Sequence, residues 1–503
     1  MGRILQRIER MSKVRIPLIG ATSDVPVNQD FENLIFNKTV NPFTGTQIVK
    51  VAKRPGINSG TSITTATDVY AVAQTPPFSN SGGSVFSVVK TGTNTIRTCE
   101  ETTVAGGDTT VTGNNGCSRI KAFTDSSGVL NWAFSVSAAV ASNKKSFIFV
   151  DGSGLTELTD AQFPDSTTTG QPAFLDGYLF WMTQDLGRIY NSDLNAPTAY
   201  GSASFLTVTS GDAGTGLANY RDKVLAIGRD YIEFYENVGN ATGSPLQQID
   251  HLRIKDYGVQ SPNGAVTDNS HRYIEAMGTF FWINHPGNSS GAGVYMLDGF
   301  QPKKISTPFL DIQLEGLIGA VIVGAMGIGG SRYLIINTGL AGDLFYVYCL
   351  DLNIWSKWTA DEFEDALPHI AHGNAVNEIH LYKDTTRYEF SLPVGTYTDA
   401  GGSLTATILT RNLDLGTGKR KRFNKLRLCG SDPGATSNCS VRWSFDNQQA
   451  YSTARTLNLA DSDGFPFTTR LGIGRQISVE ITNSSNAQME LEALELEYDE
   501  LAA

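Results

Sequence analysis

The chain has 503 residues, which is too long for one small hydrophobic core and favours two or three domains. Glycine, at 51 residues, exceeds its usual share, whereas charged residues, at 18%, fall below theirs, a composition typical of strands and turns. The 39 basic and 50 acidic residues give a net charge of −11, so the surface as a whole lacks the cationic field with which proteins grip nucleic acid.

Residues 1–55 are expected to form an N-terminal arm and short strands that lead into the next domain. Met1–Lys13 mixes charged and apolar residues without a separate apolar stretch, so no secretory signal is predicted. The five cysteines are widely spaced, apart from Cys429 and Cys439, and this spacing does not predict a disulfide framework. We expect free or buried thiols.

The region Gly56–Gly116 is rich in Ser, Thr, Gly and Asn and has few apolar runs. Such a composition indicates an early, loop-rich part of the domain or a surface insertion. We expect this region to lie at a subunit or partner surface.

Between Phe147 and Leu392 a unit recurs in which an apolar run ends in Asp, often Asp-Gly, and a second short strand follows. Asp151-Gly152 and Asp298-Gly299 are clear examples, and Asp-Gly after a strand favours a tight hairpin. The units recur at roughly the 40–50 residues of a propeller blade. Each hairpin would bury only one face, so the units are expected to stack around an axis. Residues 56–402 are therefore predicted to form a β-propeller, and the chain is assigned to the all-β class.

The stretch Gly316–Gly330 contains no charged residue. It is shorter than the 18 to 20 apolar residues that span a bilayer and is rich in glycine. A buried β-hairpin is the favoured interpretation, and a loop that touches a membrane is the alternative.

Residues 403–503 have a different sequence pattern. Apolar and polar residues alternate there in separate segments, at Thr405–Thr410, Lys425–Cys429, Cys439–Phe445 and Gln476–Thr482. The terminal segment Met489–Tyr498 alternates in a way that fits a strand or a helix. These short segments predict a C-terminal β-sandwich-like domain.

Few residues form patterns that indicate catalysis or metal binding. Gly416–Lys419 lacks the spacing of a phosphate-binding loop. His369, His372 and His380 lie in a segment expected to be β, where strand neighbours three apart point to opposite faces. Asp461–Gly464 resembles half of a calcium loop but is expected to be a plain turn. No catalytic residue, cofactor site or metal site is predicted.

One basic run stands out in this acidic protein. It is interpreted as a candidate surface for docking an acidic partner, with a solvated hairpin face and contact with DNA phosphates as the alternatives. Its members are Lys419, Arg420, Lys421, Arg422 and Lys425.

Several segments resemble the packaged-DNA stabilisation proteins of short-tailed (podovirus-type) bacteriophages. The opening Asp30–Asn37, Asn41–Gly45 and Val51–Gly56 is similar to the start of that family. The resemblance continues through most of the chain, at Asp222–Tyr235, Phe280–Pro286, Val294–Leu297, Lys421–Arg427, Trp443–Tyr451 and Arg475–Ile481.

The resemblance implies a structural virion protein of the tail, without catalytic residues. Members of the family serve as a tail hub, or nozzle, whose propeller subunits form a homohexameric ring below the portal and the head–tail adaptor. The ring surrounds genomic dsDNA without tight binding and helps to retain and then eject it. Needle or fibre proteins are the expected distal partners, and no stable membrane span is expected. The acidic balance fits this role, because carboxylates on a channel wall repel phosphate and let duplex slide.

Two other functions fit an all-β chain of this kind. The main alternative is a carbohydrate-binding or sialidase-like β-propeller used for receptor recognition, which as a hydrolase would need two carboxylates facing one pocket. The other is a propeller scaffold of the kind found in host cells.

Overall fold

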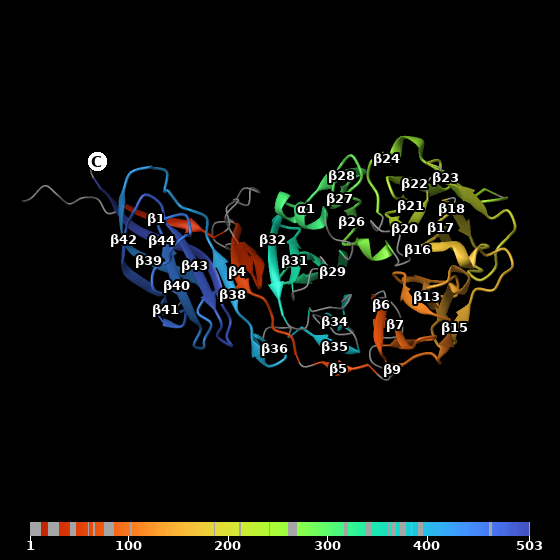
Figure 1. Cartoon of the computed structure of the whole chain (residues 1–503), viewed down its shortest axis with the longest axis horizontal. Coiled ribbons are helices and arrows are strands. Elements are labelled where there is room, and N and C mark those ends of the chain that lie inside the picture. Colours follow the sequence, from red (N-terminus) through yellow and green to blue (C-terminus); the bar gives the residue numbers. More distant parts are fainter. Residues whose placement is uncertain are drawn as a thin grey trace, which may run out of the picture.

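The computed structural model describes residues 12–18, 30–40, 47–58, 60–63, 66–74, 85–100, 103–185, 187–210, 213–240, 242–259, 269–315, 320–337, 344–360, 363, 369–372, 379–383, 385–390, 396–461 and 465–501. Within these ranges nearly all regular structure is strand, beside the single α-helix α1 (Pro308–Glu315) and short 3-10 helices. Figure 1 shows two lobes, a ring of sheets and a sandwich in which N-terminal (red) and C-terminal (blue) strands lie together.

The larger lobe is a β-propeller with seven blades, each made of four or five neighbouring strands. This arrangement confirms the all-β class and the propeller. Blade 1 comprises β6 (Asp68–Gln74), β7 (Val85–Gly92), β8 (Thr95–Glu100), β9 (Thr103–Val104) and β10 (Thr109–Thr110), and blade 2 comprises β11 (Asn114–Cys117), β12 (Lys121–Thr124), β13 (Leu130–Ala138), β14 (Lys145–Val150) and β15 (Gly154–Glu157). Blade 3 comprises β16 (Thr168–Leu175), β17 (Tyr178–Thr183), β18 (Arg188–Asn191) and β19 (Phe205–Thr207), and blade 4 comprises β20 (Gly214–Tyr220), β21 (Lys223–Gly228), β22 (Tyr231–Asn237), β23 (Leu246–Gln248) and β24 (Ile254–Lys255). Blade 5 comprises β25 (Tyr273–Ala276), β26 (Thr279–Asn284), β27 (Gly293–Asp298) and β28 (Gln301–Lys304), blade 6 comprises β29 (Val321–Ile328), β30 (Ser331–Asn337), β31 (Leu344–Cys349) and β32 (Ile354–Thr359), and blade 7 comprises β33 (His369–His372), β34 (Ile379–Lys383), β35 (Thr386–Glu389) and β5 (Thr61–Ser62).

The propeller ring is closed by blade 7, which combines strands from the two ends of the propeller sequence. The inner strands β6, β12, β16, β20, β25, β29 and β33 each contact the next, and β33 returns to β6. The short strand β5 comes from the N-terminal side of the propeller but pairs with β35, where Ser62 lies opposite Thr386. Blade 7 therefore contains both the first and the last segment of the propeller, which leaves no open edge between them.

Polar side chains of inner strands cross the axis of the propeller. Lys121 of blade 2 forms a salt bridge with Glu275 of blade 5. Arg119, which precedes β12, donates a hydrogen bond to the backbone oxygen of Ile322 in blade 6. Blade 2 is not a neighbour of blades 5 and 6, so these contacts span the centre of the ring. Nucleic acid therefore has no open passage along the axis of this propeller.

The predicted strand–turn–strand units are confirmed at the Asp-Gly positions. Asp151-Gly152 connects β14 to β15 and Asp298-Gly299 connects β27 to β28. Gly152 and Gly299 have φ angles of 73° and 64°, in the left-handed region that glycine adopts at little cost.

The apolar stretch Gly316–Gly330 contributes the innermost strand of blade 6. Residues 316–319 lie outside the described ranges, β29 is largely buried, and the turn at Gly329-Gly330 leads into β30. The predicted burial is confirmed for β29, but residues 321–330 supply only one strand and the turn of a hairpin whose second strand is Ser331–Asn337. No helix among the described residues is long and apolar enough to cross a membrane.

The smaller lobe is a sandwich of two sheets, and strands from both ends of the chain build it. One sheet has the order β3-β4-β44-β39-β42 with β1 beside β44, and the other continues from β32 of the propeller through β2-β38-β43-β40-β41. The N-terminal strands β1 to β4 share both sheets with strands of the region 403–503, from which the sequence separates them. The strands are β1 (Ser12–Pro17), β2 (Asp30–Glu32), β3 (Leu34–Val40), β4 (Gln47–Lys53), β38 (Ala406–Leu409), β39 (Lys421–Gly430), β40 (Asn438–Ser444), β41 (Arg455–Asn458), β42 (Phe467–Gly474), β43 (Ser478–Asn483) and β44 (Glu490–Glu500), with the small hairpin β36 (Thr398–Asp399) and β37 (Gly402–Ser403) between the lobes.

The C-terminal segment is a strand and not a helix. In β44 buried and partly exposed residues alternate, and Leu494 and Leu496 face the interior while Glu495 and Glu497 face outward. This alternation is the period of a half-buried strand.

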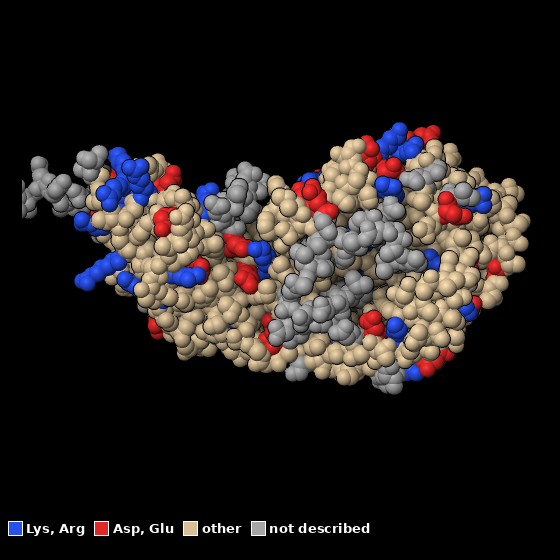
Figure 2. Space-filling view, in the orientation of Figure 1, with Lys and Arg blue, Asp and Glu red and all other residues tan. Residues whose placement is uncertain are grey.

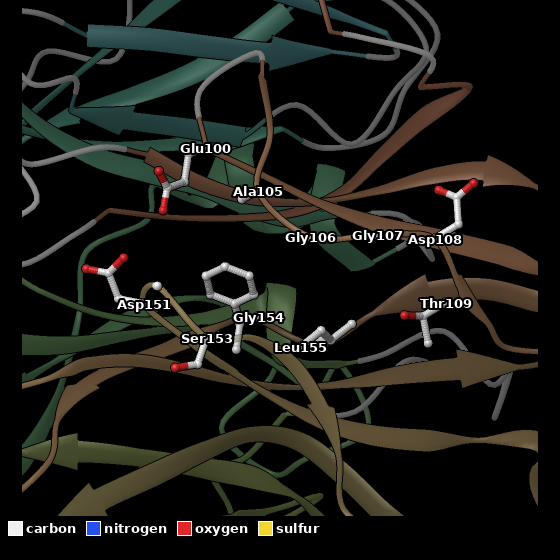
Figure 3. A pocket seen from close by; sticks show the side chains of 12 residues that line it. Glu100, Ala105, Gly106, Gly107, Asp108, Thr109, Asp151, Ser153, Gly154 and Leu155 are labelled. Carbon is white, nitrogen blue, oxygen red and sulfur yellow. The ribbon is translucent and has the colours of Figure 1, made fainter.

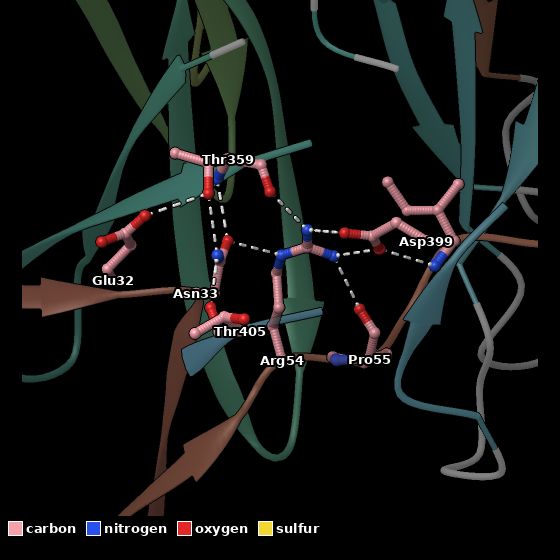
Figure 4. Close-up of polar contacts among 8 residues, drawn as sticks. Glu32, Asn33, Arg54, Pro55, Thr359, Asp399 and Thr405 are labelled. Carbon is pink, nitrogen blue, oxygen red and sulfur yellow. Dashed lines mark hydrogen bonds and ion pairs between the residues drawn. The ribbon is translucent and has the colours of Figure 1, made fainter. Parts of the chain in front are cut away.

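A buried polar cluster, here called the junction lock, joins the two lobes (Figure 4). Arg54 is 0% exposed, and its guanidinium donates to both carboxylate oxygens of Asp399, at 2.9 and 2.6 Å. It also donates to the side-chain oxygen of Asn33 at 3.0 Å and to the backbone oxygen of Thr359 at 2.9 Å. Because Thr359 ends β32 of blade 6 and Asn33 lies between β2 and β3, the lock ties the propeller to the sandwich.

Candidate docking surface

The outer face of the β1-β44-β39-β42 part of the sandwich carries its charges in columns. Register pairs Lys425 with Glu497 and Arg427 with Glu495, and β1 places Lys13 and Arg15 on the other side of β44. Glu495 lies 2.9 Å from Lys13 and 3.2 Å from Arg427. The hydrogen bond from Lys13, with help from Arg427, lowers the pKa of Glu495. The acidic column of β44 thus neutralises much of the basic charge beside it.

Two members of the predicted basic run take part in this pairing. The Lys419 ammonium lies 2.9 Å from Glu500. Lys425 is partly buried, 3.8 Å from Glu497, and its Nζ lies 4.1 Å from the centre of the Phe467 ring. Such exposed or partly exposed pairs stabilise a protein little, so Lys419 and Lys425 keep some capacity to exchange partners.

For Lys421 the docking assignment is wrong. This side chain is 0% exposed, and Nζ donates to the backbone oxygens of Thr417, Lys419 and Arg475 at 2.5, 3.1 and 2.9 Å. Burial lowers the pKa of Lys421. The side chain points inward because residues alternate along β39, and it ties the Thr417–Lys419 turn to the connection after β42.

Arg420 and Arg422 are the members of the run that remain accessible. Both side chains are exposed, and the described residues place no carboxylate in salt-bridge contact with either guanidinium. Arg422 lies directly opposite Ile473 on the edge strand β42.

Three large apolar side chains are exposed along the same edge of the sheet. Ile473 lies opposite Arg422, whereas Phe467 lies opposite Arg427 at the other end of β42, and Phe465 precedes that strand. Phe465 and Ile473 are 42% exposed and Phe467 is 48% exposed. We call the group formed by Arg420, Arg422, Phe465, Phe467 and Ile473 the apolar-basic edge. Figure 2 shows basic side chains gathered toward the outer end of the sandwich lobe. Exposed apolar residues combined with arginine are typical of a protein–protein contact.

A cleft of about 670 Å³ lies between blades 1 and 2 (Figure 3). Glu100, Asp108 and Asp151 line it, but the Asp108 carboxylate is engaged 2.6 Å from Arg97. The aromatic ring in its wall, Phe149, is only 3% exposed, so it offers no face on which a sugar could stack. Part of the polar region Gly56–Gly116 forms one wall of this cleft.

The structure assigns no chemistry to the other residues that the sequence analysis considered. His380 is buried, and the side chains of His369 and His372 lie outside the described part, as do residues 462–464. The described residues contain no group of three His, Cys, Asp or Glu side chains suited to a metal ion. All five cysteines are free and buried, as expected.

The apolar half of this surface was not predicted from the sequence. Phe465, Phe467 and Ile473 occur singly between polar residues, and each could equally be a core residue of a strand. Strand alternation would not have found them, because it places Phe467 and Leu471 on one face. The register shift between Thr469 and Gly472 leaves Leu471 buried and Phe467 exposed.

Comparison with known proteins gives one family match. The profile of the family described as "Bacteriophage P22 Gp10, beta-propeller" matches residues 84–336, half of the chain. A comparison with curated protein sequences gave no match.

Similar solved structures include the crystal structure of BBS1N in complex with ARL6DN, at 12% identity and a TM-score of 0.40, covering 68% of this chain and 98% of that one. Another is PorZ, a surface component of the type-IX secretion system of Porphyromonas gingivalis, at 10% identity and a TM-score of 0.35, covering 70% of this chain and 43% of that one.

Proposed function

We propose that this protein has a role in the virion tail, because the chain belongs to the phage structural family of the P22 Gp10 β-propeller. Within that role the protein acts as a tail hub, or nozzle, subunit. Several copies form a ring, a hexamer by analogy with the family, below the portal and the head–tail adaptor. The ring helps to retain the packaged genome and to release it at ejection. The family match over residues 84–336 is the observation that carries this proposal.

The DNA path in this proposal runs between subunits and not through a propeller. Side chains of blades 2, 5 and 6 cross the propeller axis, so a duplex would need a channel enclosed by several copies. A net charge of −11 per chain disfavours adhesion of the duplex to such a wall. Retention would then depend on closure of the tail below the hub.

The apolar-basic edge is the docking surface in this proposal. Arg420 and Arg422 with Ile473 at one end of the edge strand, and exposed phenylalanines at its other end, would bind an acidic partner that also offers apolar side chains. The head–tail adaptor or a needle or fibre protein is the proposed partner. No catalytic step, cofactor or metal is needed for this function.

The isolated protein is expected to bind free duplex DNA weakly even at about 50 mM salt, where attraction between phosphates and basic sites is strong. Filter binding across a salt series measures this affinity. The Arg420→Ser, Arg422→Ser double variant serves as the comparison and should bind DNA as weakly as the parent. Tight binding with a steep salt dependence that the double variant loses would contradict the proposal, because the hub would then grip DNA directly.

A further inference from the structure

Two polar side chains from distant parts of the chain meet inside the sandwich. Lys53 ends β4 and is 1% exposed, and Asn483 ends β43 and is 0% exposed. The Nζ atom of Lys53 lies 3.4 Å from the side-chain oxygen of Asn483. The same Nζ donates to the backbone oxygen of Ser485 at 2.8 Å, which holds the amine beside the amide group.

The surroundings favour the neutral form of this amine. No carboxylate is in salt-bridge contact with Lys53 among the described residues, and its neighbours are a backbone oxygen, an amide and the ring of Tyr397, 5.8 Å from Nζ. Burial is the main cause that lowers the pKa of Lys53 to about 8, and Arg54 lowers it further while Asp399 opposes the shift. A desolvated lysine near neutrality is a nucleophile.

The amide of Asn483 is equally fixed. Its nitrogen donates to the Ser437 hydroxyl at 3.0 Å and to the backbone oxygen of Asn438 at 3.2 Å. Ser437 is 0% exposed. The nitrogen that would leave thus already contacts a hydroxyl that can pass a proton, and burial excludes water as a competing nucleophile.

We propose that Lys53 and Asn483 join in an intramolecular isopeptide bond. The unprotonated Nζ attacks Cγ of Asn483, so the Nζ–Cγ bond forms and the Cγ–Nδ2 bond breaks. Nζ gives up one of its two protons and keeps the other as the amide N–H, and Nδ2 takes up the released proton and leaves as ammonia. The reaction needs no oxidant, reductant or further reactant.

The bond would have a mechanical consequence, because the whole propeller lies between Lys53 and Asn483 in the chain. The sandwich consists of an N-terminal and a C-terminal segment that only non-covalent contacts hold together in the absence of the bond. An isopeptide between Lys53 and Asn483 would tie these segments covalently beside the junction lock. This inference does not depend on the proposed role in the virion.

Intact-mass measurement of the purified, folded protein tests the proposal. The expected mass is below the sequence mass by one ammonia, and tandem mass spectrometry of a digest should yield one branched peptide that contains both Lys53 and Asn483. Incubation at about pH 9, above the pKa of the amine, should complete the reaction in any unreacted fraction.

Two variants and one alternative product make the test decisive. Lys53→Met should restore the full sequence mass, whereas Lys50→Met, which removes a lysine of the same strand that pairs with Glu490 on the outer face, should keep the ammonia deficit. A full sequence mass in the folded parent after alkaline incubation would overturn the proposal. An ammonia deficit carried by a linear peptide over Asn483 would also overturn it, because that product is a succinimide.

Discussion

Replacing Arg54 with methionine is expected to lower the free energy of unfolding by about 3–5 kcal/mol, the usual cost of removing one partner of a buried ion pair. The substitution would leave the Asp399 carboxylate, which is 12% exposed, without the guanidinium that lies 2.6 Å from it. It would also remove the donors to Asn33 and Thr359 and the cation that lies 5.5 Å from the ring of Phe363. Urea unfolding, followed by tryptophan fluorescence, measures the effect.

The matched control for this prediction is Arg332→Met. Arg332 also forms an arginine–aspartate pair, 2.8 Å from Asp351, but its side chain is 53% exposed. Its loss should cost no more than about 1 kcal/mol because water replaces the contact. If the two variants unfold at the same urea concentration, burial at the junction does not hold the lobes together and the lock has no special role.

The Arg420→Ser, Arg422→Ser double variant is expected to impair tail assembly by at least tenfold while the protein stays folded. An arginine at the centre of a protein contact is worth about 2 kcal/mol or more, which corresponds to roughly a thirtyfold loss of affinity. Addition of purified hub to particles that lack it, followed by counting of infectious particles, measures assembly. Lys421 is left unchanged because its ammonium holds three backbone oxygens and its loss would disturb the fold.

Arg442→Ser is the control for the docking prediction. Arg442 is exposed on the other sheet of the sandwich and pairs with Glu480 at 2.7 Å, so its loss removes a surface arginine away from the apolar-basic edge. Assembly should be normal in this variant, and the urea midpoints of both variants should match that of the parent. Normal assembly in the double variant would show that the arginines of this edge do not dock a partner.

The local signals in the sequence predicted the blades well. Asp-Gly after an apolar run produced hairpins at Asp151 and Asp298, because a glycine with positive φ follows each aspartate. The alternation of Glu and Leu near the C-terminus was compatible with two structures until pairing with β39 and β1 settled it as a strand. The hairpins depend on residues close together in the chain, whereas the C-terminal strand depends on partners far from it in sequence.

The sequence could not predict what distant pairing decides. The association of 12–54 with 403–501 needs β1 and β4 to meet β44 across the whole propeller, and no local pattern encodes that meeting. Which side chains of the basic run are exposed also depends on such pairing. Arg422 and Lys421 are neighbours of similar chemistry, but the register of β39 sends one into solvent and the other toward three backbone oxygens.

Mass photometry of the purified full-length chain tests the central claim of a ring-forming hub most directly. The account predicts a discrete species whose mass is several times that of one chain, six in a hexameric ring, in equilibrium with monomer as the concentration falls. A strict monomer at every concentration, with affinity for glycans and no association with the head–tail adaptor, would contradict it and favour the carbohydrate-binding alternative.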